Sequence, residues 1–275
     1  MTVADAIRAG AERLAKTSDT ARLDAELLMA FALGVSRSDM LIGAMRDEAP
    51  KKFNALVDRR SAHEPVAHIT GEAEFFGRPF AVSPDVLVPR GDSELLIEIA
   101  IELASDARRI LDLGTGSGAL LATALLEFGD AQGVAIDASG AALQLAESNA
   151  RSLGLSAERA QFIERSWLNN GWLADLGAFD LILCNPPYVE SDAALDADVR
   201  DYEPASALFA GIDGLDDYRV LIPQLGNLFN DNAIAVLEIG HAQATAVSDI
   251  AEKAGFSVEL RRDLANRPRA LIFRA

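Results

Sequence analysis

The spacing of apolar and polar residues divides the chain into a helical first part and a longer region of mixed elements. Between residues 1 and 64, apolar side chains recur every three or four positions, which predicts amphipathic helices. Gly34 is suited to end the second of these helices. The repeated positions are Val3, Ile7 and Leu14, then Leu23, Leu27, Leu28 and Phe31, and then Phe53, Leu56 and Val57. The pattern predicts a small all-helical domain, to which we assign residues 1–70.

Residues 71–91 lose this helical spacing. Glycines and prolines interrupt short apolar stretches around Phe75 and Phe80, as expected for short strands joined by turns. We therefore predict a β-hairpin linker over this range, followed by a helix over residues 92–104.

From residue 108, strand patterns and helix patterns alternate. Alternation of this kind predicts a mostly parallel sheet with helices on both faces, here a third domain over residues 92–275. The stretch 179–184 is apolar on both faces and is expected to be a central strand. The other strands are predicted at 109–113, 133–137, 160–163, 233–239, 257–261 and 269–274, and the helices at 119–128, 139–153, 214–229 and 242–254. A loop-rich stretch is expected at 189–213.

A glycine-rich loop, Asp112-Leu-Gly-Thr-Gly-Ser-Gly118, joins the first of these strands to its helix. Its glycines let the backbone approach a ligand closely, and the helix N-terminus offers free N–H groups. Asp137 ends the next strand, where an acidic side chain can bind ribose hydroxyls. The residues expected to bind a nucleotide-type cofactor are Gly114, Thr115, Gly116, Ser117, Gly118 and Asp137. The loop alone leaves NAD and S-adenosylmethionine open, because it also satisfies the dinucleotide pattern.

The tetrapeptide Asn185-Pro186-Pro187-Tyr188 directly follows the strand 179–184. If the strands 109–113 and 179–184 are neighbours, this tetrapeptide and the glycine loop face one crevice. A turn that merely ends a strand would need neither the Asn nor the Tyr.

The residue types of the tetrapeptide suit methyl transfer to an amide-type nitrogen. Such a nitrogen is a weak nucleophile because its lone pair is delocalised, so its two N–H bonds must be held in place. The Asn185 side-chain oxygen can accept one N–H and the Pro186 carbonyl the other, while Tyr188 forms a wall of the slot. We therefore predict Asn185, Pro186 and Tyr188 as catalytic residues.

Composition and charge narrow the partners. The formal net charge is −17, and residues 76–275 hold 15 basic against 30 acidic residues, which is unfavourable for binding nucleic-acid phosphates. The single cysteine, Cys184, allows no intramolecular disulfide. The three histidines lack metal-site spacing, and no stretch has the pattern of a signal peptide or a membrane span. We expect a cytoplasmic monomer that binds no nucleic acid, membrane or metal.

Over nearly its whole length the chain resembles the peptide chain release factor N5-glutamine methyltransferases. The Asn-Pro-Pro-Tyr motif alone is shared with adenine-N6 DNA methyltransferases, whereas the linker sequence is far more specific. The matching segments are Ile69–Gly77, Leu87–Arg90, the glycine loop, Asn185–Tyr188, Tyr202–Ala205 with Ala207-Leu208, Asp213–Asp216, Glu238–Gly240, Arg262–Leu264 and Arg267.

The resemblance implies a seven-stranded Rossmann-like sheet with one antiparallel strand, behind a helical domain that helps to hold the partner. The substrate would be the glutamine of a Gly-Gly-Gln loop on class I release factors. The methyl donor would be S-adenosyl-L-methionine, leaving S-adenosyl-L-homocysteine. The residues 114–118 and Asp137 would hold the cofactor, with Trp167 along the adenine. Asn185 would touch both cofactor and glutamine, and Pro186, Pro187 and Tyr188 would shape the glutamine slot.

Two segments depart from the family pattern. Where the family commonly reads Pro-Arg-Pro-Glu-Thr-Glu, residues 89–94 read Pro-Arg-Gly-Asp-Ser-Glu, which keeps an acid and a hydroxyl but loses the stiff proline. The acid that often precedes the tryptophan after the third strand is replaced in Arg165-Ser166-Trp167.

Three other functions are weighed against glutamine methylation. An adenine-N6 DNA methyltransferase would share the tetrapeptide, but the acidic catalytic half and the lack of a basic recognition domain disfavour it. A nicotinamide oxidoreductase would explain the glycine loop and leave residues 185–188 unexplained. A non-catalytic binding module would have no need of an intact tetrapeptide.

Overall fold

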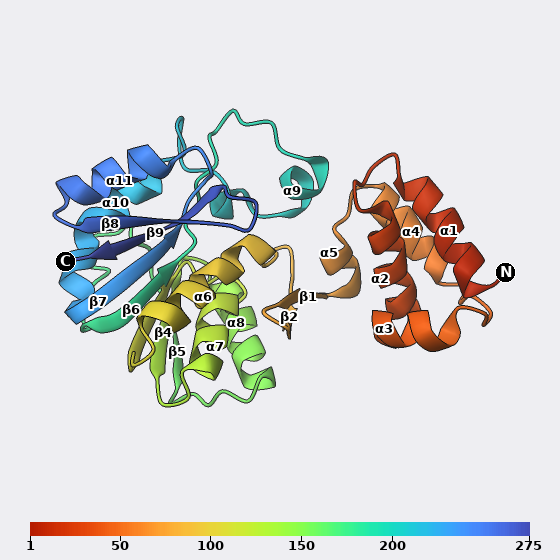
Figure 1. Ribbon diagram of the computed structural model, residues 1–275, viewed down its shortest axis with the longest axis horizontal. Helices are drawn as coiled ribbons and strands as arrows, with labels where there is room; N and C mark the ends of the chain where they lie inside the picture. Colours follow the sequence, from red (N-terminus) through yellow and green to blue (C-terminus); the bar gives the residue numbers. More distant parts are fainter. The chain divides into compact units, whose positions relative to one another are not determined.

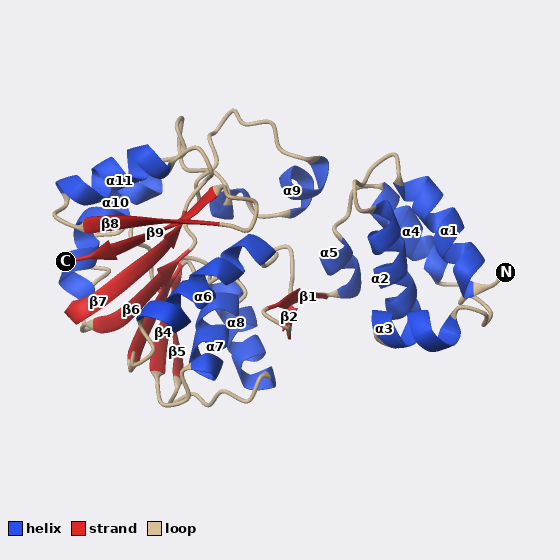
Figure 2. Cartoon of the chain, viewed as in Figure 1, coloured by secondary structure: helices blue, strands red, loops and turns tan.

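The computed structural model describes all 275 residues, which form two compact units. One unit contains Met1–Glu72 together with Leu195–Tyr202, and the other contains Ala73–Ala194 together with Glu203–Ala275. The first consists of helices and the second is built on a β-sheet (Figure 1, Figure 2). We call them the helical unit and the sheet unit.

The helical unit has a core of side chains from its longer helices. The helices are α1 (Val3–Leu14), α2 (Ala21–Leu33), α3 (Arg37–Asp39), a π-helical turn (Met40–Ala44), α4 (Phe53–Ser61), α5 (Val66–Thr70) and α9 (Ala197–Tyr202). As predicted, Gly34 ends α2. Its backbone has the left-handed conformation that residues other than glycine rarely adopt. The all-helical character predicted for this part of the chain is therefore confirmed.

Of the four apolar positions predicted on α2, only Leu28 is buried. The buried side chains of the helix include Ala25, Leu28 and Met29, whereas Leu23, Leu27 and Phe31 are 36–42% exposed. The helix packs against α1, α4 and α5, and Ala25, Ala30 and Ala32 are among its buried residues. Spacing alone could not separate these two apolar rows, because both repeat at helical intervals.

A buried ion pair lies inside the helical unit. The Arg60 guanidinium donates to Asp24 at 2.7 Å, and both side chains are 7% exposed. Arg60 also lies 3.4 Å from Asp198 of α9, and the Tyr202 hydroxyl donates to the Ala62 carbonyl at 3.0 Å. The α9 helix falls in the stretch 189–213 that the sequence predicts as loop. Its acidic sequence has no helical spacing of apolar residues, and its contacts are with residues distant in the sequence, Arg60 and Ala62.

The predicted hairpin is formed by β1 (Glu72–Phe75) and β2 (Arg78–Ala81), and it belongs to the sheet unit from Ala73 onward. Phe76 and Gly77 join the two strands, and both have positive φ, of 52° and 70°. Two consecutive residues with positive φ are the requirement of a tight type I′ hairpin turn.

The main sheet has seven strands in the order β5-β4-β3-β6-β7-β9-β8. The strand β9 runs antiparallel to both of its neighbours, and the other pairings are parallel. The predicted sheet of seven strands with one antiparallel strand is therefore confirmed. The strands are β3 (Arg109–Leu113), β4 (Gln132–Asp137), β5 (Ala160–Glu164), β6 (Phe179–Cys184), β7 (Phe229–Glu238), β8 (Ser257–Arg262) and β9 (Pro268–Arg274).

The pairing of β3 with β6 positions the site. In this register Leu113 lies beside Cys184, so the glycine loop and the tetrapeptide leave the sheet from neighbouring strands at one edge. The condition that the sequence left open, that these two strands are neighbours, is met. The strand β6 is fourth of seven, which agrees with its apolar character on both faces.

Helices cover both faces of this sheet (Figure 1). The helices α6 (Glu94–Leu103), α7 (Ala119–Glu127) and α8 (Gly140–Ser152) lie on one face, and α10 (Asp216–Leu225) and α11 (Ala244–Lys253) on the other. Alternate residues of β6 feed the two cores: Leu181 and Leu183 enter one, Ile182 and Cys184 the other. This alternation follows from the two-residue period of a strand.

Candidate functional site

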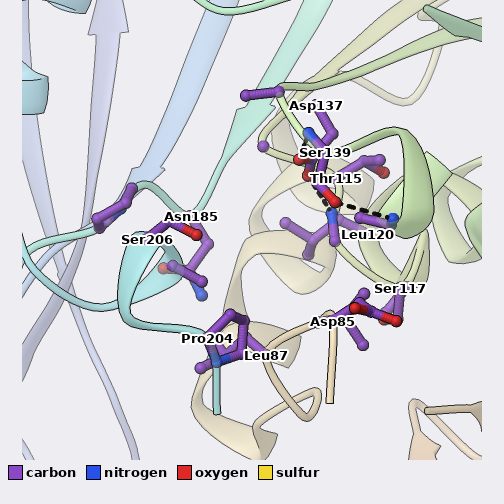
Figure 3. A pocket seen from close by; sticks show the side chains of 18 of the residues that line it. Asp85, Leu87, Thr115, Ser117, Leu120, Asp137, Ser139, Asn185, Pro204 and Ser206 are labelled. Carbon is purple, nitrogen blue, oxygen red and sulfur yellow. Dashed lines mark hydrogen bonds between the residues drawn. The ribbon is translucent and has the colours of Figure 1, made fainter. Parts of the chain in front are cut away.

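A cavity of about 410 Å³ opens at the carboxyl ends of β3, β4 and β6. This volume lies in the range of small-molecule and cofactor sites. Figure 3 shows Asn185 and Ser206 on one side of it and Thr115, Leu120 and Asp137 on the other. Of the residues predicted from the sequence, Gly114, Thr115, Gly116, Ser117, Asp137, Trp167, Asn185 and Pro187 line the cavity, and Gly118, Pro186 and Tyr188 do not.

The glycine loop packs closely against its surroundings. Gly114 has a φ of 74°, and a Cβ added to it would lie 3.1 Å from the Trp167 ring. Gly118 has a φ of 82°, and its Cβ would lie 3.0 Å from that of Ala146 in α8. Any other residue at either position would face both backbone strain and a crowded neighbour.

Two carboxylates next to the loop have different roles. Asp137 lines the cavity and accepts backbone N–H groups from Gly116 and Ser139, each at 2.9 Å. Each of its oxygens keeps a second lone pair, so the carboxylate can also accept ligand hydroxyls. Asp112 is fully buried and accepts the Thr115 hydroxyl at 2.6 Å. Burial raises the pKa of Asp112 to about 7, against the opposing effect of that hydrogen bond.

Trp167 forms part of the cavity wall and is anchored by an acidic residue. Its indole N–H donates to the Asp217 carboxylate at 2.7 Å, and Asp217 lines the same cavity. Burial raises the pKa of Asp217, and the indole hydrogen bond partly offsets this effect. The sequence motifs did not assign Asp217 a role, because it lies one residue beyond the matching segment Asp213–Asp216.

Asn185 presents an acceptor that lacks a protein partner. Its Nδ2 donates to the Ser93 hydroxyl oxygen at 3.2 Å, while its Oδ1 is buried and makes no hydrogen bond. Buried polar atoms in proteins nearly always have partners. An unpartnered acceptor in a cavity wall therefore fits a ligand that brings an N–H group.

A buried network extends from Ser93 into the sheet. The Ser93 hydroxyl donates to Glu238 Oε2, and the Tyr188 hydroxyl donates to Glu238 Oε1 at 3.1 Å. Burial raises the pKa of Glu238, partly offset by these two hydrogen bonds. Burial also raises the pKa of Tyr188, so its hydroxyl stays protonated near neutral pH. Sequence reasoning placed Ser93 and Glu238 inside family motifs without assigning either a role, since their contact joins residues 145 positions apart.

An ion pair between Arg90 and Glu203 stabilises another part of the cavity wall. Arg90 lines the cavity and donates to both oxygens of Glu203, at 2.6 and 2.7 Å. The Glu203 side chain is 1% exposed. The residues that follow it, Pro204, Ser206 and Ala207, also line the cavity, which sequence reasoning did not anticipate.

No group of three or more His, Cys, Asp or Glu side chains is placed to hold a metal ion. No single helix has the length and apolar character to cross a membrane. By length and composition only, the pair Ala21–Leu33 and Arg37–Ala44, bent by 94°, passes such a test.

Comparison with known proteins matches both parts of the chain. The PrmC N-terminal domain matches residues 5–71, and the methyltransferase small domain matches residues 90–201. A release factor glutamine methyltransferase from Cereibacter sphaeroides is 40% identical over 98% of this chain and 97% of its own length. One from Bradyrhizobium diazoefficiens is 39% identical over 92% of this chain and 88% of its own length.

A solved structure shares the fold. A methyltransferase from Pyrococcus furiosus superposes with a TM-score of 0.50 and 18% identity, covering 80% of this chain and 96% of its own.

Proposed function

The chain belongs to the release factor glutamine methyltransferase family, and we propose that it methylates the side-chain amide nitrogen (N5) of a glutamine. The methyl donor is S-adenosyl-L-methionine. The substrate is the glutamine of the Gly-Gly-Gln loop on class I release factors. The observation that carries this proposal is the unpartnered Oδ1 of Asn185 in the cavity wall, which suits a carboxamide N–H.

The cofactor is assigned to the part of the cavity formed by the glycine loop. The residues 114–117, Asp137 and Trp167 would hold it, with the carboxylate of Asp137 accepting ribose hydroxyls through its remaining lone pairs. When bound, the cofactor supplies an electrophilic methyl group. Asn185 lies across the cavity from Asp137, where it can face both cofactor and glutamine (Figure 3).

The protein groups act by holding the acceptor nitrogen. Asn185 Oδ1 accepts one N–H of the carboxamide and the Pro186 carbonyl accepts the other, which turns the nitrogen lone pair toward the methyl group. Positive charge grows on the nitrogen during transfer, so these two oxygens favour the transition state over the ground state. Pro187 shapes the slot directly, and Tyr188 supports it from outside the cavity lining. The Tyr188 hydroxyl already donates to Glu238, and the amide proton leaves after transfer, so no base is required beforehand.

We assign docking of the release factor to residues 1–70, the linker to 71–91 and methyl transfer to 92–275. The exposed apolar side chains Leu23, Leu27 and Phe31 on α2 support a docking role for the helical unit. The protein is expected to act as a monomer in the cytoplasm.

A methyl-transfer assay with labelled S-adenosylmethionine tests the proposal. The acceptors are an unmodified release factor, the same factor with its loop glutamine changed to alanine, and adenine-containing duplex DNA. We expect label on the first acceptor only, and none with Asn185→Ala. Label on the DNA would favour the adenine-N6 alternative, and equal label on both proteins would refute glutamine as the target.

Cofactor identity is tested separately by thermal unfolding. A ligand that binds the folded state raises the melting temperature by mass action. We expect S-adenosylhomocysteine to raise it and NAD to leave it unchanged. The reverse result would assign the cavity to a nicotinamide cofactor.

A further inference from the structure

Three side chains form a hydrogen-bonded relay that starts in the cavity wall and ends behind it. Asn185 Nδ2 donates to Ser93 Oγ at 3.2 Å, and the Ser93 hydroxyl donates to the Glu238 carboxylate. Ser93 is 5% exposed and Glu238 is 1% exposed, so water competes little for these bonds. Asn185 and Ser93 line the cavity, whereas Glu238 lies behind them.

Glu238 is held at both ends. Its second carboxylate oxygen accepts the Tyr188 hydroxyl at 3.1 Å, and its backbone carbonyl accepts the Tyr218 hydroxyl at 2.7 Å. Tyr218 is fully buried in the sheet unit. The carboxylate is therefore a stationary acceptor at the inner end of the relay.

The chemistry of these groups dictates the direction of every hydrogen bond. Both oxygens of Glu238 act as acceptors, one from the Tyr188 hydroxyl and one from Ser93, so the Ser93 hydroxyl donates its one proton to Glu238. The oxygen of Ser93 is then left with lone pairs and can only accept from Asn185. The Asn185 amide must turn its NH₂ group to Ser93 and its Oδ1 away from it.

The opposite orientation of the Asn185 amide is disfavoured twice. The two ends of an amide are nearly alike in shape, so its partners decide which way it points. Turned by half a rotation, Asn185 would set its oxygen against the lone pairs of Ser93 and would lose a buried hydrogen bond. In that orientation the Asn185 N–H groups would also face the N–H groups of the substrate carboxamide, and two donors cannot form a hydrogen bond with each other.

We propose that Ser93 and Glu238 are positioning residues that hold the Asn185 side-chain oxygen toward the acceptor nitrogen. The identity of that nitrogen rests on the proposed function. The orientation of the Asn185 amide does not, so the two can be tested apart.

The orientation is tested by nuclear magnetic resonance of the ¹⁵N-labelled protein bound to S-adenosylhomocysteine. The side-chain amide signal of Asn185 is assigned by its loss in Asn185→Ala. We expect the proton facing Ser93 to be protected from solvent exchange in the wild-type protein and in Ser93→Thr, which keeps the hydroxyl. Protection should be lost in Ser93→Ala and in Glu238→Gln, whose amide can donate to Ser93 and reverse its hydroxyl.

Methyl transfer to the release factor tests the consequence. We expect Ser93→Ala and Glu238→Gln each to lower kcat about tenfold, with KM for S-adenosylmethionine changed less than about twofold. The double variant should lose no more than the worse single variant, because both act through one side chain. Ser93→Thr should retain near wild-type kcat. The control is Thr123→Val in α7, which removes a buried hydroxyl that has no hydrogen-bond partner and should leave kcat unchanged.

The outcomes separate the two ideas. Protection of the Asn185 amide that persists in Ser93→Ala would overturn the positioning role, whatever the activity. Equal loss of kcat in Ser93→Ala and Ser93→Thr, or additive losses in the double variant, would overturn it as well. If the wild-type protein shows the protected amide but does not label the release factor, the orienting relay stands and the proposed substrate falls.

Discussion

Asn149 joins three segments of the sheet unit, and its removal offers a sharp test of how the glycine loop is held. This residue of α8 is 3% exposed. Its Oδ1 accepts the Ala81 N–H at 2.9 Å, while its Nδ2 donates to the carbonyls of Ala81 at 3.0 Å and Ser117 at 2.9 Å. One amide thus connects the hairpin strand β2, the helix α8 and the loop that lines the cavity.

The expected cost of Asn149→Ala follows from these contacts. Each hydrogen bond contributes a net ~1 kcal/mol, and a buried carbonyl left without a partner costs about 1–3 kcal/mol. The Ser117 carbonyl is buried in this contact, whereas the Ala81 groups are partly buried and can be rehydrated. We therefore expect a loss of about 3–4 kcal/mol in the free energy of unfolding. We also expect weaker binding of S-adenosylhomocysteine, because Ser117 lines the cavity.

Urea unfolding followed by tryptophan fluorescence measures this loss. Both tryptophans, Trp167 and Trp172, lie in the sheet unit, so the signal reports on that unit. The matched control is Ser148→Ala, an exposed neighbour on the same helix, which should change the free energy by less than about 0.5 kcal/mol. Asn149→Asp keeps one acceptor and loses both donors, and should be at least as destabilised as Asn149→Ala. A free energy for Asn149→Ala within error of the Ser148→Ala value would refute the reasoning.

Three further perturbations test other parts of the structure. Asp112 has a pKa of about 7 in the fold and about 3.8 unfolded, so its own contribution to wild-type stability should fall as pH rises from 4 to 7. In urea titrations, Asp112→Asn should lose this pH-dependent contribution, which amounts to up to ~4 kcal/mol in the free energy of unfolding. Parallel profiles of stability against pH for the wild-type protein and the variant would contradict this expectation. Gly214→Ala would place a Cβ 2.3 Å from the Tyr188 carbonyl oxygen, and it should lower kcat at least about tenfold while cofactor binding is retained. Gly129→Ala, whose Cβ would have no atom within 4 Å, should leave kcat unchanged. Arg60→Met leaves a buried carboxylate unpaired and should destabilise the helical unit by roughly 3–5 kcal/mol, seen as faster hydrogen exchange in α2 and α4; unchanged exchange would show that the ion pair is dispensable.

Local patterns in the sequence predicted most of the elements. The strands β3 and β6 begin and end at the predicted residues, because each is a short apolar run between turn residues. The alternation of strands and helices predicted a parallel sheet, since parallel strands need crossover connections. The glycine loop was recognisable because its chemistry is contiguous in the chain.

Contacts between distant residues could not be predicted in this way. The α9 segment has no apolar period, and its contact with Arg60 spans 138 positions. On α2 two apolar rows repeat at the same interval, and only packing against other helices decided which one is buried.

The sequence by itself determined the type of most elements, though not the helix α9, together with the glycine loop and the Asn-Pro-Pro-Tyr turn, because these depend on neighbouring residues. Tertiary structure alone decided that Leu113 lies beside Cys184, which sets the loop and the turn on one cavity. It also decided that Ser93 and Glu238 meet behind Asn185. The direction in which an amide points depends on the partners that the fold brings to it, and no local pattern encodes those partners.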